Sequence, residues 1–465
     1  MENNDGRFER IVAREQGLHR SLSSKQMAMI AIGGAIGTGL FLGSGFAIGF
    51  AGPSVLISYA IGAMIALLLI ACLAEMTVAH PTSGSFGAFA EHYINPWAGF
   101  VVRYAYWSGN VLAIGAEVTA VALYMQYWFP NSPAWFWILL FSSSLILVNA
   151  LSVHVFGTIE YWFATIKVSA IIVFILLGAW LVYDAPAGGA IGFANYVRYG
   201  GFMPNGPMGT WTAVIVSIFS YLGIEMIAVA AGEAKDPERA ITQAFRAAML
   251  RLAVFYMLTL MLILAIIPWT KAGHDKSPFV MVMEAVHIPG AAGLINFVIL
   301  VAALSAMNSQ LYITTRMMFS LSRAGFAPRR LGLLNQQGVP VWALMLSSGG
   351  IAIAGVLSVV YPKTSFTLMM ATSMFGAMFT WFMIFISHFM FRRHWNKEGK
   401  RQLAFRMWGF PWLTLLGAGL MLAIMLTTAF TKEFAMTLIV GLPFLALLSA
   451  LYFIWYRQSK HVVDG

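Results

Sequence analysis

Twelve apolar stretches, each about as long as a bilayer-crossing helix, follow one another along the 465-residue chain. A lipid core ~30 Å thick is crossed by about 20 apolar residues in a helix, and inside it every backbone polar group needs a protein partner. The sequence therefore predicts an all-α polytopic membrane protein with twelve transmembrane helices. The predicted spans are residues 26–50, 53–77, 98–129, 133–153, 160–183, 209–232, 249–270, 289–320, 340–361, 365–390, 409–430 and 435–456.

The composition excludes the soluble classes of protein. Hydrophobic residues make up 60% of the chain and charged residues 10%, whereas a soluble domain usually carries about 25% charged residues. The single cysteine, Cys72, lies in an apolar run and has no possible disulfide partner in the chain. The nine histidines lack the spacing of metal ligands, and no nucleophile constellation is present. We therefore expect no metal, no cofactor and no enzyme activity.

The positive charges predict the orientation in the membrane. If the N-terminus is cytoplasmic, 22 of the 28 Lys and Arg residues fall on the cytoplasmic side, in the tails, in alternate connections and at the adjoining ends of the spans. This bias predicts an even number of spans and two cytoplasmic termini. It also accounts for the net charge of +10, so the expected partner is the lipid bilayer and no nucleic acid is needed.

The first span contains four glycines within seven residues, Gly33, Gly34, Gly37 and Gly39. Glycine disfavours a continuous helix, so the run predicts an unwound segment at mid-membrane. Its free N–H and C=O groups would bind a zwitterion in a cavity. The alternative is close packing against another helix, because Gly33-xxx-Gly37 matches the small-xxx-small pattern.

The sixth span repeats this theme, since Gly223 is flanked by polar and aromatic residues and precedes the carboxylate of Glu225. Two broken helices, one at the start of each half of a chain, are typical of transporters built from inverted repeats. The expected organisation is a cytoplasmic tail (1–25), two repeats of five spans (26–183 and 209–390), two appended spans (409–456) and a cytoplasmic tail (457–465).

Among the charged residues of the predicted spans, the ones of interest are Glu75, Glu117, Lys167 and Glu225. Each costs a few kcal/mol in lipid and needs a partner or water. Glu75 is next to a loop, so we expect it to reach the cytoplasmic interface. Glu117 and Glu225 lie deeper, which favours a functional role over a purely structural hydrogen bond.

Lys167 is up to two turns into the fifth span, and Glu160 is at the start of that span. Burial disfavours the ammonium form of Lys167, so this residue could exchange protons near neutral pH. The alternative is that Lys167 extends to the cytoplasmic headgroups. Glu160 is most simply a charge at the N-terminus of the helix.

Five runs of residues carry a family resemblance. They are 34–41 (GAIGTGLF), 161–167 (YWFATIK), 219–225 (FSYLGIE), 231–239 (AGEAKDPER) and 305–309 (SAMNS). In this order, over nearly the whole chain, they resemble the bacterial amino acid transporter (amino acid permease) family of the amino acid–polyamine–organocation superfamily.

The resemblance implies a fold of the leucine-transporter type, with the first and sixth spans unwound at the substrate site. The N–H groups of Thr38 and Gly39, with the Thr38 hydroxyl, would receive the substrate α-carboxylate. The carbonyls of Ala35, Phe219 and Leu222 would receive the α-ammonium. Half-helix N-termini carry partial positive charge and C-termini present unpaired carbonyls, which agrees with this assignment.

The resemblance also implies roles for individual side chains. Phe219 is similar to an aromatic gate, and Glu225 to a carboxylate that links substrate to gating. Lys167 resembles a lysine that replaces a sodium ion between the first, fifth and eighth spans in some relatives, which favours proton coupling. The implied proton-coupling residues are Lys167, Glu225 and Glu117. The rest of the implied substrate site is Ile36, Gly37, Ser220, Gly223, Glu117, Ser305 and Asn308.

Together these observations predict a proton-coupled amino acid importer of the bacterial inner membrane that works by alternating access. We expect a monomer or a weak homo-oligomer. The alternative is an amino acid/amine exchanger, which needs no coupled proton.

Overall fold

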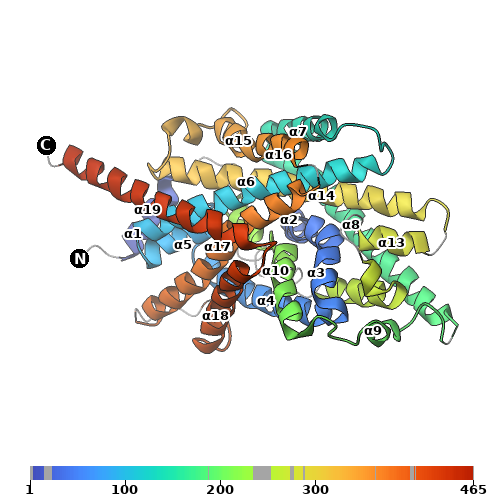
Figure 1. The fold of residues 1–465 in the computed structure, drawn as a ribbon. Helices are drawn as coiled ribbons and strands as arrows, with labels where there is room; N and C mark the ends of the chain where they lie inside the picture. Colours follow the sequence, from blue (N-terminus) through green and yellow to red (C-terminus); the bar gives the residue numbers. More distant parts are fainter. Residues whose placement is uncertain are drawn as a thin grey trace.

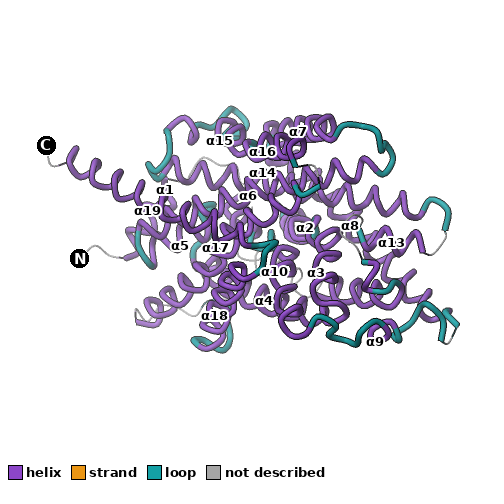
Figure 2. The backbone as a smooth tube through the Cα atoms, viewed as in Figure 1, coloured by secondary structure: helices purple, strands orange, loops and turns teal. Residues whose placement is uncertain are grey.

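The computed structural model describes residues 4–14, 23–186, 188–233, 253–272, 277–285, 288–361, 363–397, 403 and 405–463. Throughout these ranges the regular structure is helical, with no strand, and the long helices pack side by side (Figure 1, Figure 2). Most of the 231–239 run lies outside the described residues. Ten helical stretches of the described chain are long and apolar enough to cross a membrane.

The first half of the chain contains the helices α1 to α8. The first predicted span consists of α2 (Ser24–Ala35), the π-helical turn η1 (Gly39–Gly43) and α3 (Ser44–Ala51). The remaining helices of this half are α1 (Asn4–Arg14), η2 (Gly52–Ser54), α4 (Val55–Ala79), α5 (Ser85–Tyr93), α6 (Pro96–Gln126), α7 (Ala134–Leu151) and α8 (Val153–Asp184).

The second half begins after the short helix α9 (Asn195–Arg198). Its sixth span is split into α10 (Gly206–Tyr221) and α11 (Met226–Ala230). The other elements are η3 (Ala231–Glu233), the helix Ala253–Ile266, η4 (Trp269–Lys271), α13 (Pro278–Ala285), α14 (Ala291–Arg323), η5 (Arg329–Gly332), α15 (Val341–Ser347), α16 (Gly349–Val360), α17 (Ser365–Lys397), α18 (Trp412–Thr427), η6 (Thr428–Phe430) and α19 (Ala435–Val463).

Each of the twelve predicted spans contains helix among its described residues. The ten long stretches are fewer because Gly39–Ala79 counts as one stretch although it covers two predicted spans. Gly52, with φ +61°, turns the chain between them, and Pro53 follows it. The helix Ala253–Ile266 is apolar but shorter than the others.

The fifth span begins earlier than the sequence predicts. Ser152 caps α8 by accepting a hydrogen bond from the Val155 amide at 3.2 Å, so the helix begins at Val153 instead of residue 160. Glu160 is therefore two turns inside the helix, and its assignment as an N-terminal helix charge is wrong.

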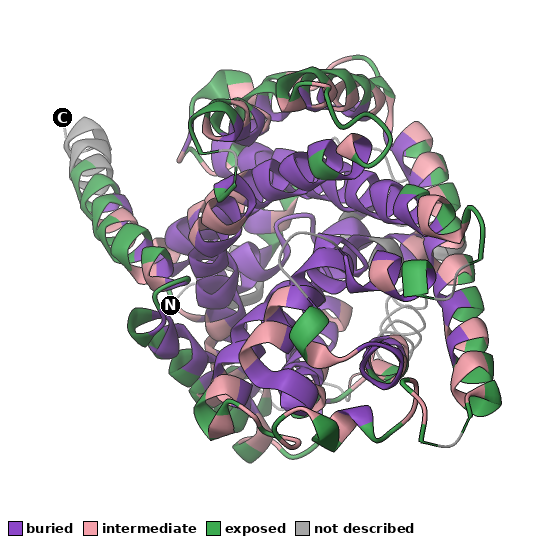
Figure 3. Cartoon of the chain, turned by 45° about the vertical axis from the view of Figure 1, so that its right-hand side comes forward, coloured by how far each residue is buried: buried purple, intermediate pink, exposed green. Residues whose placement is uncertain are grey.

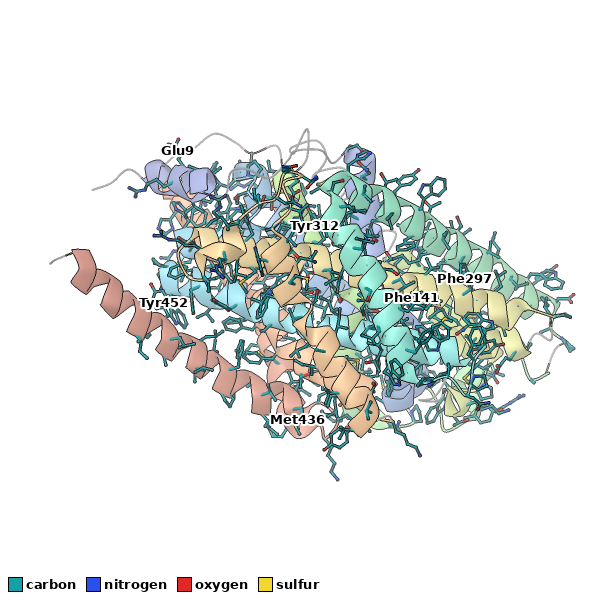
Figure 4. All side chains as sticks on the ribbon, turned by 90° about the horizontal axis from the view of Figure 1, so that it is seen from above. Glu9, Phe141, Phe297, Tyr312, Met436 and Tyr452 are labelled. Atoms are coloured by element: carbon teal, nitrogen blue, oxygen red, sulfur yellow. The ribbon has the colours of Figure 1, made fainter. Side chains whose placement is uncertain are left out.

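Buried side chains concentrate in the middle of the bundle, where α6 packs along α14 and α17 and where α10 packs on α3 and α4 (Figure 3). The outward-facing side chains are largely apolar, among them Phe297 near the start of α14 and Met436 of α19, whereas Tyr312 is buried (Figure 4). An apolar exterior around a polar-containing interior is the arrangement expected of a membrane protein, because the lipid is as apolar as the side chains that face it.

Glu75 does not reach an interface, so that expectation is wrong. The carboxylate is 1% exposed and lies 3.0 Å from His388 Nε2 and 2.6 Å from Arg392 Nε, both on α17. It also accepts a 3.0 Å hydrogen bond from the Met407 amide. The chain after α17 returns over the end of α4 and closes this cluster, which joins segments more than 300 residues apart in sequence.

Removal of the Glu75 carboxylate should leave Arg392 buried without its partner. We expect Glu75→Ala to lower the free energy of unfolding by about 3–5 kcal/mol. Thermal unfolding of the purified protein in detergent measures this. The control is Glu9→Ala, which removes an exposed carboxylate of α1. A Glu75→Ala protein as stable as the control would contradict the structural role.

Candidate functional site

The first and sixth spans are both interrupted in the middle of the bundle. In the first, α2 ends at Ala35, the chain bends at residues 36 and 37, and η1 begins at Gly39. In the sixth, Leu222 is extended with ψ 147° and Gly223 has φ +97°, before α11 begins at Met226. We call residues 36–38 the first break and residues 222–225 the second break.

The second break and the end of α10 lie against the first span on either side of the first break. A Cβ atom at Gly39 would be 2.6 Å from Cα of Ser220, and a Cβ at Gly223 would clash with the Gly34 carbonyl oxygen. The glycines therefore serve both of the roles that the sequence left open. They permit the interruptions, and they allow two backbones to approach more closely than any side chain would allow.

Lys167 connects α8 to the first break. Its ammonium is fully buried and donates hydrogen bonds to the Ile36 carbonyl at 2.9 Å and to Ser305 Oγ at 2.7 Å. The side chain therefore does not extend to the headgroups. It lies between the first, fifth and eighth spans. There its ammonium contacts the carbonyl of Ile36, which follows the end of α2.

Ser305 and Asn308 of α14 face Glu160 of α8. The Ser305 hydroxyl donates to Glu160 Oε1, and the Asn308 amide donates to Glu160 Oε2 at 3.1 Å. Asn308 in turn accepts a 2.7 Å hydrogen bond from Asn149 of α7. The polar atoms of these two sequence-predicted site residues thus engage a carboxylate that the sequence did not single out for function.

Glu117 and Thr38 are close to the first break on the α6 side. A Cβ at Gly37 would be 3.1 Å from Glu117 Oε1, which puts the carboxylate beside the bent backbone. The Thr38 hydroxyl and Glu117 Oε2 are buried and make no hydrogen bond of good geometry to any described residue. The Thr38 hydroxyl and amide are nevertheless the polar groups that face the Glu117 carboxylate, so the two residues are neighbours beside the first break.

Glu225 ties the second break to two other helices. It accepts hydrogen bonds from Tyr106 of α6 at 2.8 Å and from Trp381 of α17 at 3.3 Å, and also from the Gly223 amide at 3.2 Å. Tyr106 and Trp381 had no signal in the sequence, because both are ordinary aromatic residues in apolar runs. Phe219 is 7% exposed on the last turn of α10.

Tyr256, on the helix Ala253–Ile266, bridges the ends of α2 and α10. Its buried hydroxyl lies 2.7 Å from the Ala35 carbonyl oxygen and 2.9 Å from that of Ser220. The Ser220 hydroxyl is itself 2.8 Å from the hydroxyl of Tyr59. Helix C-termini leave carbonyls without intrahelical partners, and a single phenol here serves two of them. Sequence reasoning missed this residue as well.

Metal binding has no support among the described residues, where no group of three or more His, Cys, Asp and Glu could hold an ion. What the site offers is backbone N–H and C=O groups at two helix breaks, with buried charges beside them. In a helical membrane bundle these are the features of a transporter for small charged solutes.

Comparison with known proteins gives the family. A model of the amino acid permease family matches residues 26–463. The chain belongs to this family. It is a multi-pass membrane protein that transports amino acids, and it is not an enzyme.

The similar proteins are bacterial amino acid permeases. An uncharacterized amino acid permease of Bacillus subtilis, YtnA, is 37% identical over 95% of this chain and 96% of its own length. The gamma-aminobutyric acid permease of the same species is 38% identical over 90% of this chain and 89% of its own. The aromatic amino acid transport protein AroP of Salmonella typhimurium is 39% identical over 82% and 84%.

A side chain at Gly39 should separate the breaks. We expect Gly39→Ala to abolish amino acid uptake, because its Cβ would meet Ser220 backbone atoms at 2.6 and 3.0 Å that cannot move aside cheaply. Gly43→Ala is the matched control one turn on, where the nearest atom is Cγ1 of Val216 at 3.4 Å. Uptake by cells that express each variant at equal levels is the measurement. Equal uptake by both variants would contradict the close approach.

Loss of the Tyr256 hydroxyl should loosen both breaks. Tyr256→Phe removes the one hydroxyl proton that the buried Ala35 and Ser220 carbonyls share, so we expect a loss of about 1–3 kcal/mol in stability and a lower uptake rate. Tyr196→Phe is the control. Its hydroxyl donates a hydrogen bond to the Met261 carbonyl at 2.8 Å and makes no hydrogen bond to a described residue of either break. Thermal unfolding and uptake are measured on both. Similar uptake by the two variants would argue against a role for Tyr256 at the breaks.

Proposed function

We propose that this protein imports amino acids by proton symport, with a substrate site that opens alternately to the two sides of the membrane. The observation that carries the proposal is the contact of the buried Lys167 ammonium with the Ile36 carbonyl at 2.9 Å. A titratable charge on the first break gives a direct route by which protonation can change the substrate site. Glu117, close enough to interact with Lys167 electrostatically, and Glu225, on the second break, are proposed to contribute.

Proton coupling is favoured over sodium coupling by the kind of cation present. The Ile36 carbonyl and the Ser305 hydroxyl are oxygen groups that could hold a metal cation, and here they accept hydrogen bonds from Lys167. A tethered ammonium occupies that position permanently, but it can lose its charge by releasing a proton.

The substrate is proposed to bind between the breaks. Its carboxylate meets the N–H groups of Thr38 and Gly39 and the Thr38 hydroxyl, and there it competes with the Glu117 carboxylate, which faces Thr38. Its ammonium meets carbonyls at Ala35, Phe219 and Leu222. Phe219 is the proposed gate. The other proposed members of the site are Ile36, Gly37, Ser220, Gly223, Glu117, Ser305 and Asn308.

Binding of the substrate ammonium competes with contacts already present. The Ala35 carbonyl accepts the Tyr256 hydroxyl at 2.7 Å, and the Phe219 carbonyl accepts the Leu222 amide at 3.3 Å. A carbonyl oxygen has two lone pairs, so a charged ammonium can be added to, or replace, these neutral donors.

The proposed architecture is that of twelve spans with both termini in the cytoplasm. It counts Gly39–Ala79 as two spans and includes the helix Ala253–Ile266. Residues 26–183 and 209–390 form the inverted repeats of a leucine-transporter-type fold, and 409–456 the appended pair. The two broken helices, one in each repeat, support this division. The protein is proposed to act as a monomer or weak homo-oligomer.

Substrate and coupling are tested with purified protein. A thermal-shift screen against amino acids, gamma-aminobutyrate and polyamines identifies the ligand, because binding raises the melting temperature with ligand concentration over Kd. The names of the relatives direct attention to gamma-aminobutyrate and aromatic amino acids. In proteoliposomes, a symporter accumulates substrate under an inward proton gradient without internal substrate. An exchanger requires preloading.

The role of Lys167 is tested by Lys167→Ala. We expect substrate binding to persist in weakened form while the pH dependence of uptake disappears, since the titratable group on the first break is gone. Lys271→Ala, which removes an exposed lysine of η4, is the control. An unchanged pH profile of uptake in Lys167→Ala would show that the proton role is assigned to the wrong residue.

A further inference from the structure

A chain of hydrogen bonds leads from Lys167 away from the first break. The ammonium donates to Ser305 Oγ at 2.7 Å, and the Ser305 hydroxyl donates to Glu160 Oε1. Both bonds point in the same direction, from a proton donor to a carboxylate. All three side chains are 0% exposed, so the chain is closed to bulk solvent along its length.

Lys167 and Glu160 are well separated along α8, and Ser305 connects the ends of their side chains. Lys167 and Glu160 are seven residues apart, which puts them on one face of the helix about 10 Å apart along its axis. Ser305 of α14 lies between their side chains and bonds to both. Asn308, held by Asn149 at 2.7 Å, keeps the other carboxylate oxygen in place at 3.1 Å.

Other charged groups face α8 from the helices that pack against it. Glu117 of α6 interacts with Lys167 electrostatically from the side of the first break. Near the start of α8, Tyr312 stacks on Phe156 with ring centres 4.3 Å apart. Its neighbour Arg316 is paired with Glu233 at 2.8 Å. His154 of α8 is exposed, and no described side chain of α2 or α7 is charged.

We propose that Glu160 accepts the proton that Lys167 releases, with Ser305 as the relay. An N–H bond of the ammonium breaks and its proton passes to the Ser305 oxygen, while the hydroxyl proton of Ser305 passes to Glu160 Oε1. The products are a neutral amine, an unchanged serine and a neutral carboxylic acid. Two buried opposite charges become two neutral groups, so the transfer leaves no unpaired charge in the interior.

The transfer also changes the first break. The Ile36 carbonyl then faces a neutral amine in place of an ammonium, and hydrogen bonds from charged donors are roughly twice as strong as neutral ones. The released proton meanwhile lies two turns from Val153, the end of α8 that the positive charges predict to be cytoplasmic. The inference rests on the proposed proton symport and names the residue through which the proton leaves.

A structural role and a relay role make different demands on Glu160. Glutamine has the volume of glutamate and can accept the Ser305 hydroxyl hydrogen bond through its amide oxygen, but it cannot take up a proton. Threonine at position 305 keeps the relaying hydroxyl, whereas alanine removes it. The informative variants are therefore Glu160→Gln, Ser305→Ala and Ser305→Thr.

The test uses the full chain in proteoliposomes with the amino acid identified by the thermal-shift screen. An inward gradient of one pH unit supports about tenfold accumulation if one proton moves with each substrate. We expect wild type and Ser305→Thr to accumulate substrate, and Glu160→Gln and Ser305→Ala to equilibrate it at a ratio of about one. Wild type and Glu160→Gln should both exchange substrate between equal pools without a gradient.

Two control variants and a measurement of internal pH distinguish a loss of proton relay from a loss of folded protein. Glu284→Gln removes an exposed carboxylate, and Ser387→Ala removes a buried hydroxyl that makes no hydrogen bond of good geometry to the described residues. Both should accumulate substrate as wild type does. A pH-sensitive dye inside the vesicles should report acidification on substrate addition for wild type, and none for Glu160→Gln.

The outcomes distinguish the two hypotheses. If wild type accumulates substrate and Glu160→Gln does so equally, the relay is wrong while proton symport stands. If wild type exchanges substrate but never accumulates it under the gradient, proton symport and the relay are both wrong. If Glu160→Gln fails to fold, the relay is tested by comparing accumulation in Ser305→Ala and Ser305→Thr. Accumulation by Ser305→Ala at the wild-type level overturns the relay.

Discussion

The structure depends on one constraint, which is that backbone groups released by a broken helix inside a membrane must find partners there. Two breaks release such groups, and buried side chains supply the partners. Lys167 donates a hydrogen bond to the Ile36 carbonyl, and Tyr256 donates one to the carbonyl of Ala35. Glu225 accepts a hydrogen bond from the Gly223 amide. Lys167 and Tyr256 come from other helices, whereas Glu225 belongs to the second break itself. The partners of the first break are therefore in place only when the surrounding helices are packed around it.

Buried charges in this protein form two kinds of cluster. Glu75 and Glu233 are paired with arginines and join helices at positions away from the breaks. Lys167 and Glu225 instead contact the breaks themselves, and Glu160 is one serine away from Lys167. The first kind stabilises the arrangement of the helices, because loss of one partner leaves a bare charge in the interior. The second kind puts titratable side chains on the backbone that is proposed to hold the amino acid.

The sequence was a good guide wherever the signal was local. Apolar length predicts where the helices lie, with ends that differ by up to seven residues in α8, α17 and α19, and glycine runs predict the breaks, because lipid and backbone entropy act on each segment by itself. Local reasoning failed at Glu160 and Glu75, both read as charges near helix ends. Their partners lie about 150 and more than 300 residues away, so no nearby residue could reveal that they are buried. Tyr256 gave no signal at all, since its neighbours are apolar.

By itself, then, the sequence determined that this chain is helical, crosses a membrane many times, interrupts two of its helices and belongs among the amino acid permeases. Those properties follow from composition, spacing and short motifs, which are read along the chain. Only the tertiary structure decided which polar groups meet, namely that Lys167 contacts the first break, that Ser305 links it to Glu160, and that one phenol bridges α2 and α10. Such pairings depend on how helices distant in sequence pack together, and the pattern within any single helix does not contain that information.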